Sequence, residues 1–372
     1  MSSTKPGRTL VCRLHLRNFR NIADLVLEPA PRFNLISGDN GHGKTSLIEG
    51  LYLLCTSQSF RSKRLNETIQ QNEERALLSA QTESFGLKRH LKANVSRRGR
   101  SFLIDEKRPK RLVDYALSTP VIAFHPGDLL LANGPAQARR TLLDRVILHE
   151  DPTGADARIQ YKRALKDRQL LLKGQGGSNA ELDAYEEVAA RYGSRFSRAR
   201  RAAAKSVIEA IEPAFRQMAH SDLSCRVEYD AGGTEDAVEF SAELKKRRRV
   251  DALRGSASFG PQRDDLCLFV DERPARTHAS QGQQRLLTLS MKLAELACVR
   301  QVTKMEPILL LDDVSSELDR ERTAAVFRLL QASRSQVFVT TTRPELFSEV
   351  LVSTEERADF CMRNGELEKL RL

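Results

Sequence analysis

The chain has 372 residues, of which 40% are hydrophobic and 29% charged, and its 60 Lys and Arg against 49 Asp and Glu give a formal net charge of +11. This composition is typical of a soluble globular protein, and no apolar run reaches the roughly 20 residues that a membrane-spanning helix needs. The basic excess favours a polyanionic partner such as nucleic acid, although a basic surface without a partner stays open.

The cysteines and the N-terminus indicate where in the cell the protein is expected. The six cysteines are scattered and form no C-x-x-C pair, which argues against a metal cluster or a redox dithiol. Most of them lie in apolar runs and are expected to be small reduced core residues. The N-terminus has no apolar signal region, so we expect a cytoplasmic protein without a membrane association.

Strands come first along the chain. Alternating apolar residues predict a strand at 10–16, further strands follow at 25–29 and 33–37, and the last of these runs into a glycine-rich turn and a helix over 44–56. Charged, irregularly alternating residues between about 75 and 105 predict antiparallel strands of a solvent-facing sheet. The apolar stretch 121–124 predicts a short buried strand.

Helical spacing then dominates. Residues from about 135 to 213 are rich in Ala, Arg, Leu, Glu and Lys, with glycines at 174–177 between two long segments. This pattern predicts an antiparallel helical hairpin, too short and irregular for a long coiled coil. Strands are expected at 225–229 and 265–270, with a basic helix ending at 245–249 between them.

The last third returns to an α/β pattern. We expect a helix from 281 to about 300, a buried strand at 307–313, a helix from about 320, a strand at 336–342, and a final small helix and hairpin. Strand–helix alternation at both ends predicts one α/β core with a mixed sheet, interrupted by an inserted helical lobe. The expected parts are 1–124 with the phosphate-binding loop, 125–258 as the inserted lobe, and 259–372.

The strongest motif is GDNGHGKT, which fits G-x-x-x-x-G-K-[ST] between a predicted strand and a predicted helix. Its backbone N–H groups would surround phosphate oxygens, Lys44 would neutralise the β- and γ-phosphates, and Thr45 would coordinate Mg²⁺. A purely structural glycine turn is the alternative. The predicted nucleotide-binding residues here are Gly38, Asp39, Asn40, Gly41, His42, Gly43, Lys44, Thr45 and Ser46.

A second motif, PILLLDD, ends a buried strand in two carboxylates. The first, Asp312, is the predicted second Mg²⁺ ligand beside Thr45. Asp313 would position or deprotonate the attacking water, and together with Lys44 it is a predicted catalytic residue. A turn or helix-capping aspartate is the alternative interpretation. The following Ser315–Asp319 matches the D-loop of ATP-binding-cassette ATPases.

A third motif, SQGQQ, opens the helix predicted at 281–300, at the place where cassette ATPases carry their signature motif. A serine hydroxyl, helix N-terminal N–H groups and a glycine that permits close approach make an anion site. Such a site would cap the γ-phosphate held by a second subunit, so that ATP bridges a two-fold dimer. Ser280, Gly282 and Gln283 are the predicted ATP-contacting residues, and an ordinary N-capped helix is the alternative.

Taken together, these motifs resemble the RecF family of bacterial recombination and gap-repair ATPases, which is related to the heads of SMC proteins. The resemblance runs from about Leu10 to Gly365 through LHLRNFRNI, SQSFRS, FHPGDLLLANGPAQARRTLLD, GPQRDDL, SQGQQR and LLLDDVSSELD. The third and fourth are specific because transporter cassettes lack them. Gln262 replaces the family's usual His, and Thr340–Thr342 stand where transporter cassettes carry a switch histidine, which suggests slow hydrolysis.

The resemblance implies an ABC-type, SMC head-like P-loop ATPase that uses ATP and Mg²⁺. It implies an ATP-dependent homodimer that binds DNA at single-stranded gaps and single-strand/double-strand junctions, with weak, DNA-stimulated hydrolysis. It also implies partnership with RecR and RecO in loading RecA, and a place in recombinational repair, replication and the SOS response.

Basic clusters offer candidate DNA contacts, because Lys and Arg bind phosphates regardless of sequence. Each cluster can equally be a solvated surface. With aromatics at 6% and no Trp, backbone contacts are favoured over base stacking. The candidates are Arg61, Lys63, Arg64, Arg139, Arg140, Lys245, Lys246 and Arg247.

Three other functions stay open. A transporter-type nucleotide-binding subunit would share the first two motifs but not the inserted block or GPQRDDL. A small-molecule P-loop kinase would have no use for SQGQQ. A DNA-binding switch that binds ATP but hardly hydrolyses it differs from the leading hypothesis only in rate.

Overall fold

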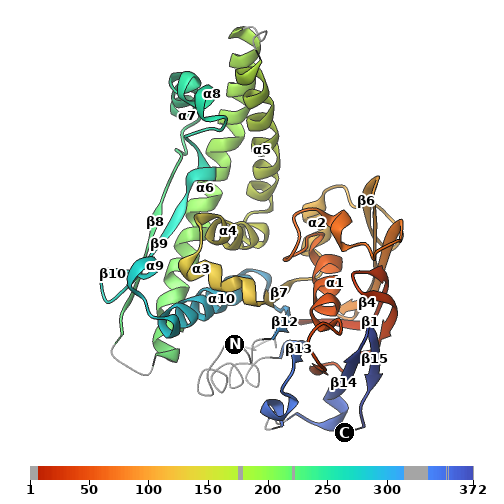
Figure 1. The fold of residues 1–372 in the computed structure, drawn as a ribbon. Coiled ribbons are helices and arrows are strands. Elements are labelled where there is room, and N and C mark those ends of the chain that lie inside the picture. Colours follow the sequence, from red (N-terminus) through yellow and green to blue (C-terminus); the bar gives the residue numbers. More distant parts are fainter. Residues whose placement is uncertain are drawn as a thin grey trace. The chain divides into compact units, whose positions relative to one another are not determined.

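The computed structural model describes residues 7–174, 179–219, 223–313, 334–348, 350 and 352–371 (Figure 1). The chain divides into two compact units. The core unit comprises Met1–Asp128 and Val299–Leu372, and the helical unit comprises Leu129–Cys298. The helical unit is therefore an insertion within the sequence of the core unit, as predicted.

A mostly parallel sheet lies at the centre of the core unit, with the strand order β15-β14-β3-β13-β12-β7. All neighbours in it are parallel except β14 and β15. Four of its strands are buried along their whole length, which explains their unbroken apolar sequences. The bounds are β3 (Phe33–Ser37), β7 (Val121–Phe124), β12 (Ile308–Asp312), β13 (Val337–Thr341), β14 (Arg357–Arg363) and β15 (Glu366–Lys369).

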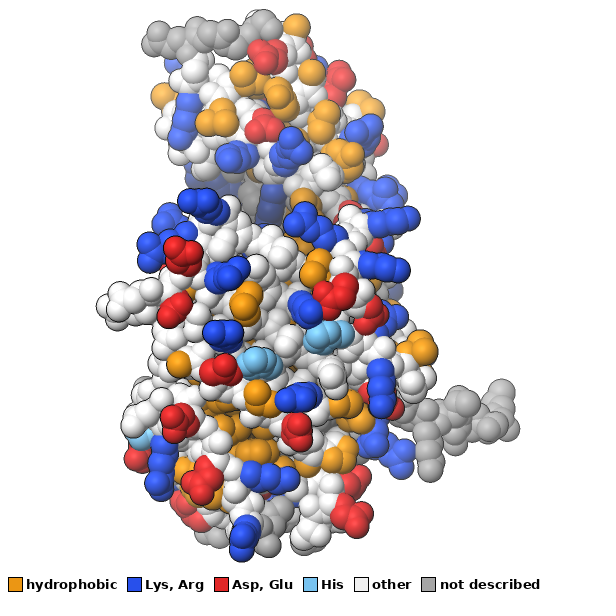
Figure 2. Space-filling model, turned by 90° about the vertical axis from the view of Figure 1, so that its right-hand side faces the viewer, with side chains coloured by type: hydrophobic (Ala, Val, Ile, Leu, Met, Phe, Trp, Pro, Cys, Tyr) orange, Lys and Arg blue, Asp and Glu red, His pale blue; other side chains and the backbone are white. Residues whose placement is uncertain are grey.

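A second sheet of the core unit has the order β11-β1-β4-β5-β6, with β2 also paired to β1, and it is antiparallel except where β11 pairs with β1. Burial alternates along β4, so one face packs inward and the other meets solvent, as expected for this charged region. In Figure 2, lysines and arginines lie interspersed with acidic side chains. The bounds are β1 (Gly7–Phe19), β2 (Ile22–Leu27), β4 (Arg75–Ser84), β5 (Leu87–Ser96), β6 (Gly99–Ile104) and β11 (Met305–Glu306).

Helix α1 (Lys44–Thr56) packs against strands of both sheets, including β12, β13, β1 and β4. It is buried on all sides, which accounts for its apolar sequence LIEGLYLLC. The predicted final small helix is a single 3₁₀ turn. The remaining elements are α2 (Leu112–Leu117) and the 3₁₀ turns η1 (Leu65–Thr68), η2 (Pro126–Leu129), η4 (Pro344–Phe347) and η5 (Thr354–Glu356).

The helical unit is built around α5 and α6, which pack along each other as the predicted hairpin. The sequence suggested two helices, but the structure has a further helix, α4, before them. The chain ends α4 and starts α5 at Asp151 and Pro152. There the Asp151 carboxylate caps α5 by accepting hydrogen bonds from the N–H groups of Thr153 and Gly154. The bounds are α3 (Leu130–Asn133), α4 (Ala136–Glu150), α5 (Pro152–Lys173), α6 (Asn179–Met218), α7 (Ala237–Lys246), α8 (Arg248–Arg254), η3 (Pro261–Arg263), α9 (Ala275–His278) and α10 (Gln281–Thr303).

The helical unit extends to Cys298, whereas the sequence suggested a boundary at residue 258. Two contacts explain the difference. Strand β9 (Asp265–Val270) pairs along its length with β8 (Cys225–Asp230) and ends against the short β10 (Arg273–Pro274). In addition, Asp265 forms an ion pair with Arg139 of α4. Residues just after 258 therefore belong to the packing of the inserted unit.

Other expectations from composition can be compared with the described residues. No described helix is long and apolar enough to cross a membrane. Within the described ranges no group of three or more His, Cys, Asp or Glu side chains is placed to hold a metal ion. The expectation that most cysteines are core residues was wrong, because only Cys55 and Cys298 are buried and Cys12 is exposed.

Candidate nucleotide-binding site

The phosphate-binding loop connects the end of β3 to the start of α1, where both neighbours of β3 also end. Gly38, Gly41 and Gly43 have φ of 142°, 84° and 111°, in the range that glycine adopts without strain. A Cβ on Gly38 would lie 2.4 Å from the carbonyl oxygen of Met362 in β14. The glycine spacing therefore serves both the curl of the loop and its close packing on the sheet.

Lys44, the first residue of α1, is almost fully buried and folds back over the loop. Its ammonium group donates hydrogen bonds to the carbonyl oxygens of Gly38 (2.7 Å) and Asp39 (2.8 Å). Burial lowers the pKa of Lys44, and the carboxylates of Asp313, Asp312 and Asp39 oppose this effect. The loop thus holds one cation among its own carbonyl groups.

The two predicted Mg²⁺ ligands lie in contact. The Thr45 hydroxyl donates a hydrogen bond of 2.9 Å to Oδ1 of Asp312, which is buried at the end of β12. Burial raises the pKa of Asp312, although hydrogen bonds from Thr340 and Thr45 counteract it. A hydroxyl and a carboxylate at one point are hard oxygen donors of the kind that Mg²⁺ prefers, so this pair fits the ion.

Thr340 of β13 was not predicted to belong to this site, yet it forms hydrogen bonds with both Asp312 and Asp313. Its hydroxyl donates to Oδ1 of Asp312 (2.8 Å) and accepts from the backbone N–H of Asp313 (3.0 Å). Asp313 itself has a positive φ of 50°, which turns the chain sharply after β12. The only sequence signal was the threonine run itself, in the place of the transporter histidine.

Asn21, in the turn between β1 and β2, supports the loop from the second sheet. Its amide donates to the carbonyl oxygen of Gly41 (3.2 Å), and its Oδ1 accepts from the Ser46 hydroxyl (2.8 Å). The backbone N–H of Gly365 bonds to the His42 carbonyl oxygen. Sequence reasoning quoted Asn21 only as part of the LHLRNFRNI stretch, and this contact gives that stretch a physical role.

An open cavity of about 500 Å³ lies over the loop, lined by Lys44, Thr45, Asp313 and Arg61 among others. Arg61, expected from sequence to contact DNA, therefore borders this cavity. Its guanidinium lies 3.3 Å from Glu49 of α1, a fully buried carboxylate that also forms two hydrogen bonds with Arg20. Glu49 thus anchors two arginines at the edge of the cavity, a link that sequence reasoning missed.

The SQGQQ segment forms the start of α10, with Ser280 and Gln281 exposed and Gly282, in the first turn, half-buried. Ser280 and Gln283 form a reciprocal cap. The Gln283 N–H donates to the Ser280 hydroxyl (3.2 Å), and the Ser280 N–H donates to the Gln283 side chain (2.8 Å). The Ser280 hydroxyl, which the functional interpretation assigns to an anion, thus takes part in the cap of this helix. The predicted D-loop, Ser315–Asp319, lies outside the described residues.

Arg139 is not an exposed DNA contact, contrary to the sequence hypothesis. It is buried and forms two hydrogen bonds with the Asp265 carboxylate, at 2.7 and 2.9 Å. Arg140 is half-buried and donates to the carbonyl oxygen of Asp264 (2.7 Å). These arginines join the FHPGDLLLANGPAQARRTLLD and GPQRDDL motifs to each other, because each stretch supplies one side of the contacts.

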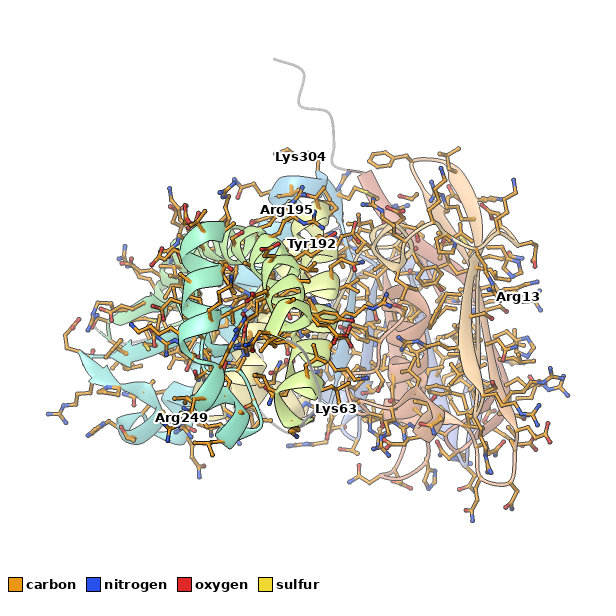
Figure 3. The ribbon with its side chains drawn as sticks, turned by 90° about the horizontal axis from the view of Figure 1, so that it is seen from above. Arg13, Lys63, Tyr192, Arg195, Arg249 and Lys304 are labelled. Atoms are coloured by element: carbon orange, nitrogen blue, oxygen red, sulfur yellow. The ribbon has the colours of Figure 1, made fainter. Side chains whose placement is uncertain are left out.

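The other basic candidates lie at the surface. Lys63, labelled in Figure 3, and Arg64 are exposed in the loop after α1. Lys245 lies near Asp183 (3.4 Å) and Lys246 near Glu243 (3.8 Å). Arg247 is half-buried, bonded to Glu243 and stacked over the ring of Phe259. Among these, Lys63 and Arg64 are the basic side chains with no carboxylate partner in the described part of the chain.

Known proteins similar to this chain cover most of its length. The family described as "RecF/RecN/SMC N terminal domain" matches residues 10–363. A "DNA replication and repair protein RecF" of Anaeromyxobacter sp. (strain Fw109-5) is 35% identical over 88% of this chain and 91% of its own length. The protein of the same name from Myxococcus xanthus (strain DK1622) is 34% identical, over 88% and 90%.

Solved structures agree on the fold. One described as "recombination mediator protein RecF-ATP in RecFOR pathway" superposes with a TM-score of 0.88 at 24% identity, covering 100% of both chains. An Smc head domain from Pyrococcus furiosus gives a TM-score of 0.55 at 17% identity over 98% of this chain and 96% of that one. The predicted fold class, a head-like ABC-type α/β fold with an inserted helical lobe, is confirmed.

Proposed function

The chain belongs to the RecF family of DNA replication and repair proteins, and we propose from this premise that it is a slow ATPase that binds DNA as an ATP-bridged homodimer. The observation that carries the proposal is the contact of Thr45 with Asp312 beside Lys44, at the base of an open cavity. The phosphate-binding loop and the carboxylate that ends β12 thus meet in one place.

The nucleotide-binding residues would divide the work of holding ATP. Backbone N–H groups of the loop and the start of α1 would bind phosphate oxygens, while Lys44 would transfer its hydrogen bonds from the carbonyl oxygens to the β- and γ-phosphates. Thr45 and Asp312 would hold the Mg²⁺ ion. The ion, when bound, neutralises charge that develops on the phosphates during hydrolysis.

Asp313 would orient or accept a proton from the attacking water. Thr340 would fix the direction of this residue through the hydrogen bond to its backbone N–H. A threonine hydroxyl does not change its protonation state near neutral pH, whereas a histidine can accept and release a proton there. This difference supports slow turnover, in which bound ATP persists and hydrolysis resets the protein, and DNA would accelerate the step.

Ser280, Gly282 and Gln283 would complete the site of a second copy. The start of α10 is exposed and carries no acidic residue in its first turn, so it can approach an anion. The Ser280 hydroxyl, which now accepts from Gln283, keeps its own proton to donate to a γ-phosphate oxygen. ATP would then bridge two protomers.

DNA binding would use exposed cations such as Lys63 and Arg64, with gaps and single-strand/double-strand junctions as the preferred DNA. The family resemblance implies that the chain would act with RecR and RecO to load RecA and so support the SOS response. We place this work in the cytoplasm, together with the other proteins that act on the chromosome.

Two variants test the bridge by gel filtration with ATP and a gapped duplex at two salt concentrations. Asp313→Asn should keep ATP bound and accumulate a dimer, because the water is no longer activated. Ser280→Arg should bind ATP with unchanged affinity yet stay monomeric, because a large cation blocks the helix start. Gln281→Arg, at the neighbouring exposed position, is the control for added charge.

Dimerisation of Ser280→Arg at the wild-type ATP concentration would exclude the bridged arrangement. A monomer that hydrolyses ATP at the full rate at every protein concentration would exclude it as well. Loss of salt-dependent DNA binding in Lys63→Glu/Arg64→Glu, with dimerisation retained, would identify the loop after α1 as a DNA contact.

A further inference from the structure

A second hollow, unrelated to the nucleotide cavity, lies within the helical unit. It measures about 570 Å³ and is bounded by the second half of α5 on one side and by the segment from Gly255 to Arg263 on the other. That segment includes Gln262 and Arg263 of the GPQRDDL motif, whose family resemblance the proposed function leaves without a role. Four cations line the hollow: Lys162, Lys166, Lys173 and Arg263.

These cations differ from the other basic side chains nearby. Lys245, Arg247 and Arg248 each lie against a carboxylate. None of the four lining cations has a carboxylate within 4 Å in the described part of the chain. Arg263 is nevertheless held in place, because its guanidinium donates to the carbonyl oxygen of Ala257 at 3.0 and 2.8 Å. The hollow therefore presents concentrated positive charge in a defined position.

The floor of the hollow is not polar. Leu165, Leu170 and Ala257 line it, and Leu170 exposes 60% of its surface. A leucine left open to solvent between lysines favours a ligand that brings an apolar group together with negative charge.

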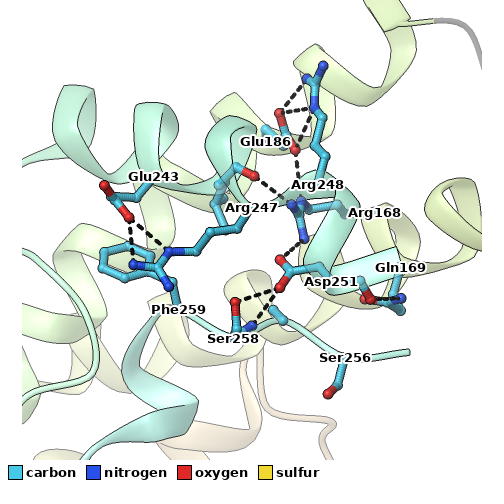
Figure 4. Close-up of polar contacts among 12 residues, drawn as sticks. Arg168, Gln169, Glu186, Glu243, Arg247, Arg248, Asp251, Ser256, Ser258 and Phe259 are labelled. Carbon is cyan, nitrogen blue, oxygen red and sulfur yellow. Dashed lines mark hydrogen bonds and ion pairs between the residues drawn. The ribbon is translucent and has the colours of Figure 1, made fainter. Parts of the chain in front are cut away.

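Gln169 ties the α5 side of the hollow to α8. Its side-chain N–H donates to the carbonyl oxygen of Asp251 (3.2 Å), which fixes the direction of the amide (Figure 4). Its Oε1 is buried away from solvent, so this amide belongs to the wall of the hollow.

The wall behind the hollow is rigid. Arg168, fully buried, bonds Glu186 of α6 at 2.9 Å and Asp251 of α8 at 2.8 Å, as Figure 4 shows. Asp251 also accepts hydrogen bonds from the N–H (2.8 Å) and hydroxyl (2.7 Å) of Ser258. The segment after α8 is thereby tied to both helices of the hairpin, so the lining groups are preorganised and binding would require little ordering.

We propose that this hollow docks an acidic peptide segment of a partner protein, with an apolar side chain next to its carboxylates. The lysines and Arg263 would pair with the carboxylates, and Leu165 and Leu170 would cover the apolar side chain. A duplex DNA backbone meets only the charge requirement, because it offers no apolar side chain beside its phosphodiester groups. The hollow does not depend on the nucleotide site.

Fluorescence anisotropy tests the proposal on the full chain. The probe is a fluorescein-labelled peptide of aspartates and glutamates with interspersed leucines, and a second probe has serines in place of the leucines. The leucine peptide should bind at least tenfold more tightly. Lys166→Glu and Leu170→Ser, both at exposed positions, should each weaken its binding about tenfold, while ATP affinity and thermal unfolding stay unchanged.

Arg195→Glu is the matched control, because Arg195 is exposed on α6 (Figure 3) and the change in net charge is the same as in Lys166→Glu. It should change peptide affinity less than twofold. Equal weakening by Arg195→Glu would overturn the proposal in favour of a general attraction between opposite charges. Equal affinity of the two peptides would overturn it too, as would a duplex oligonucleotide that competes with the leucine peptide and loses affinity equally in Lys166→Glu.

Discussion

The phosphate-binding loop and the GPQRDDL segment use polar residues in opposite ways. In the loop, Lys44, Thr45 and Asp313 line an open cavity, and the contacts of Lys44 are with backbone carbonyl groups. In the GPQRDDL segment, Asp264 and Asp265 are surrounded by their partners. Asp265 binds Arg139 through both oxygens, and Asp264 accepts from the Tyr229 hydroxyl (2.7 Å) and the Gly232 N–H (2.8 Å).

The pKa of Asp264 also reflects the packed surroundings of the GPQRDDL segment. Burial raises the pKa of Asp264, and the nearby Arg200, with the Tyr229 and Gly232 hydrogen bonds, opposes the rise. The carboxylate is thus stabilised as part of the packing of α6 and β8. A motif shared by a family can therefore mark a site of chemistry or a joint between elements. Whether its polar groups face an open cavity or one another distinguishes the two.

The largest effect is expected from breaking the buried charges of the helical unit. Arg168→Met should lower the free energy of unfolding by about 3 to 5 kcal/mol, because Asp251 would be left buried without its cation and Glu186 would keep only Arg248. Urea unfolding followed by far-UV circular dichroism measures this. Arg198→Met, on the exposed face of α6, should change it by less than about 0.5 kcal/mol. A loss below about 1 kcal/mol for Arg168→Met would contradict the structural role.

The loop should show the reverse behaviour. Lys44→Ala should weaken ATP binding roughly a hundredfold, about 2.7 kcal/mol, because the phosphates lose their cation. The free energy of unfolding should stay within about 1 kcal/mol, since the hydrogen bonds of the Lys44 side chain are with carbonyl groups of the loop itself. Isothermal titration calorimetry and urea unfolding measure the two quantities. Arg168→Met should retain the wild-type ATP affinity. Weaker ATP binding by this variant would contradict the separation of the loop from the helical unit.

A smaller effect concerns His149 at the end of α4. Burial lowers its pKa to about 4, although Glu295 opposes the shift, and its Nδ1 is buried without a hydrogen bond in the described residues. Between pH 6.5 and 4 the unfolded chain binds this proton and the folded chain does not, so stability falls as the pH drops through that window. Between pH 7 and pH 5 the free energy of unfolding of His149→Gln should therefore fall by roughly 1 to 2 kcal/mol less than that of the wild type, as measured by urea unfolding at each pH. An unchanged pH dependence would be evidence against a neutral buried imidazole.

The smallest effect is expected at Thr340. Thr340→Val removes the hydrogen bonds to Asp312 and to the Asp313 N–H, each of which contributes about 1 kcal/mol. ATP turnover should fall about fivefold while ATP affinity changes less than threefold. Thr342→Val, at an exposed position in the same run, should leave both unchanged. A coupled-enzyme assay with and without DNA distinguishes these outcomes.

Much of the core unit could be predicted from sequence because its signals are local. The strand at 33–37 and the helix at 44–56 have the bounds that the apolar run and the glycine motif indicated. Alternating residues likewise predicted the charged antiparallel sheet. Thr45 and Asp312 were assigned to one metal ion from separate motifs, and they do lie in hydrogen-bonding contact.

The rest depended on contacts between distant segments. Arg139 was interpreted as a surface cation, because its partner Asp265 lies far from it in the sequence and no local pattern predicts the pair. Asn21 and Thr340 look ordinary in their own strands, and only the packing of two sheets on the loop gives them roles. The inserted unit was extended past residue 258 by the pairing of β8 with β9, which also lies outside local patterns.

The strand order of the parallel sheet also fixes when the nucleotide site can form during synthesis. Strand β3, which carries the phosphate-binding loop, has β13 and β14 as its two neighbours, and both leave the ribosome about 300 residues later. The nascent chain must therefore carry this apolar strand unpaired while the whole inserted unit is made, a stage at which aggregation competes with folding. The sheet around the phosphate-binding loop is consequently completed only at the end of translation, and a truncated product would lack both neighbours of β3.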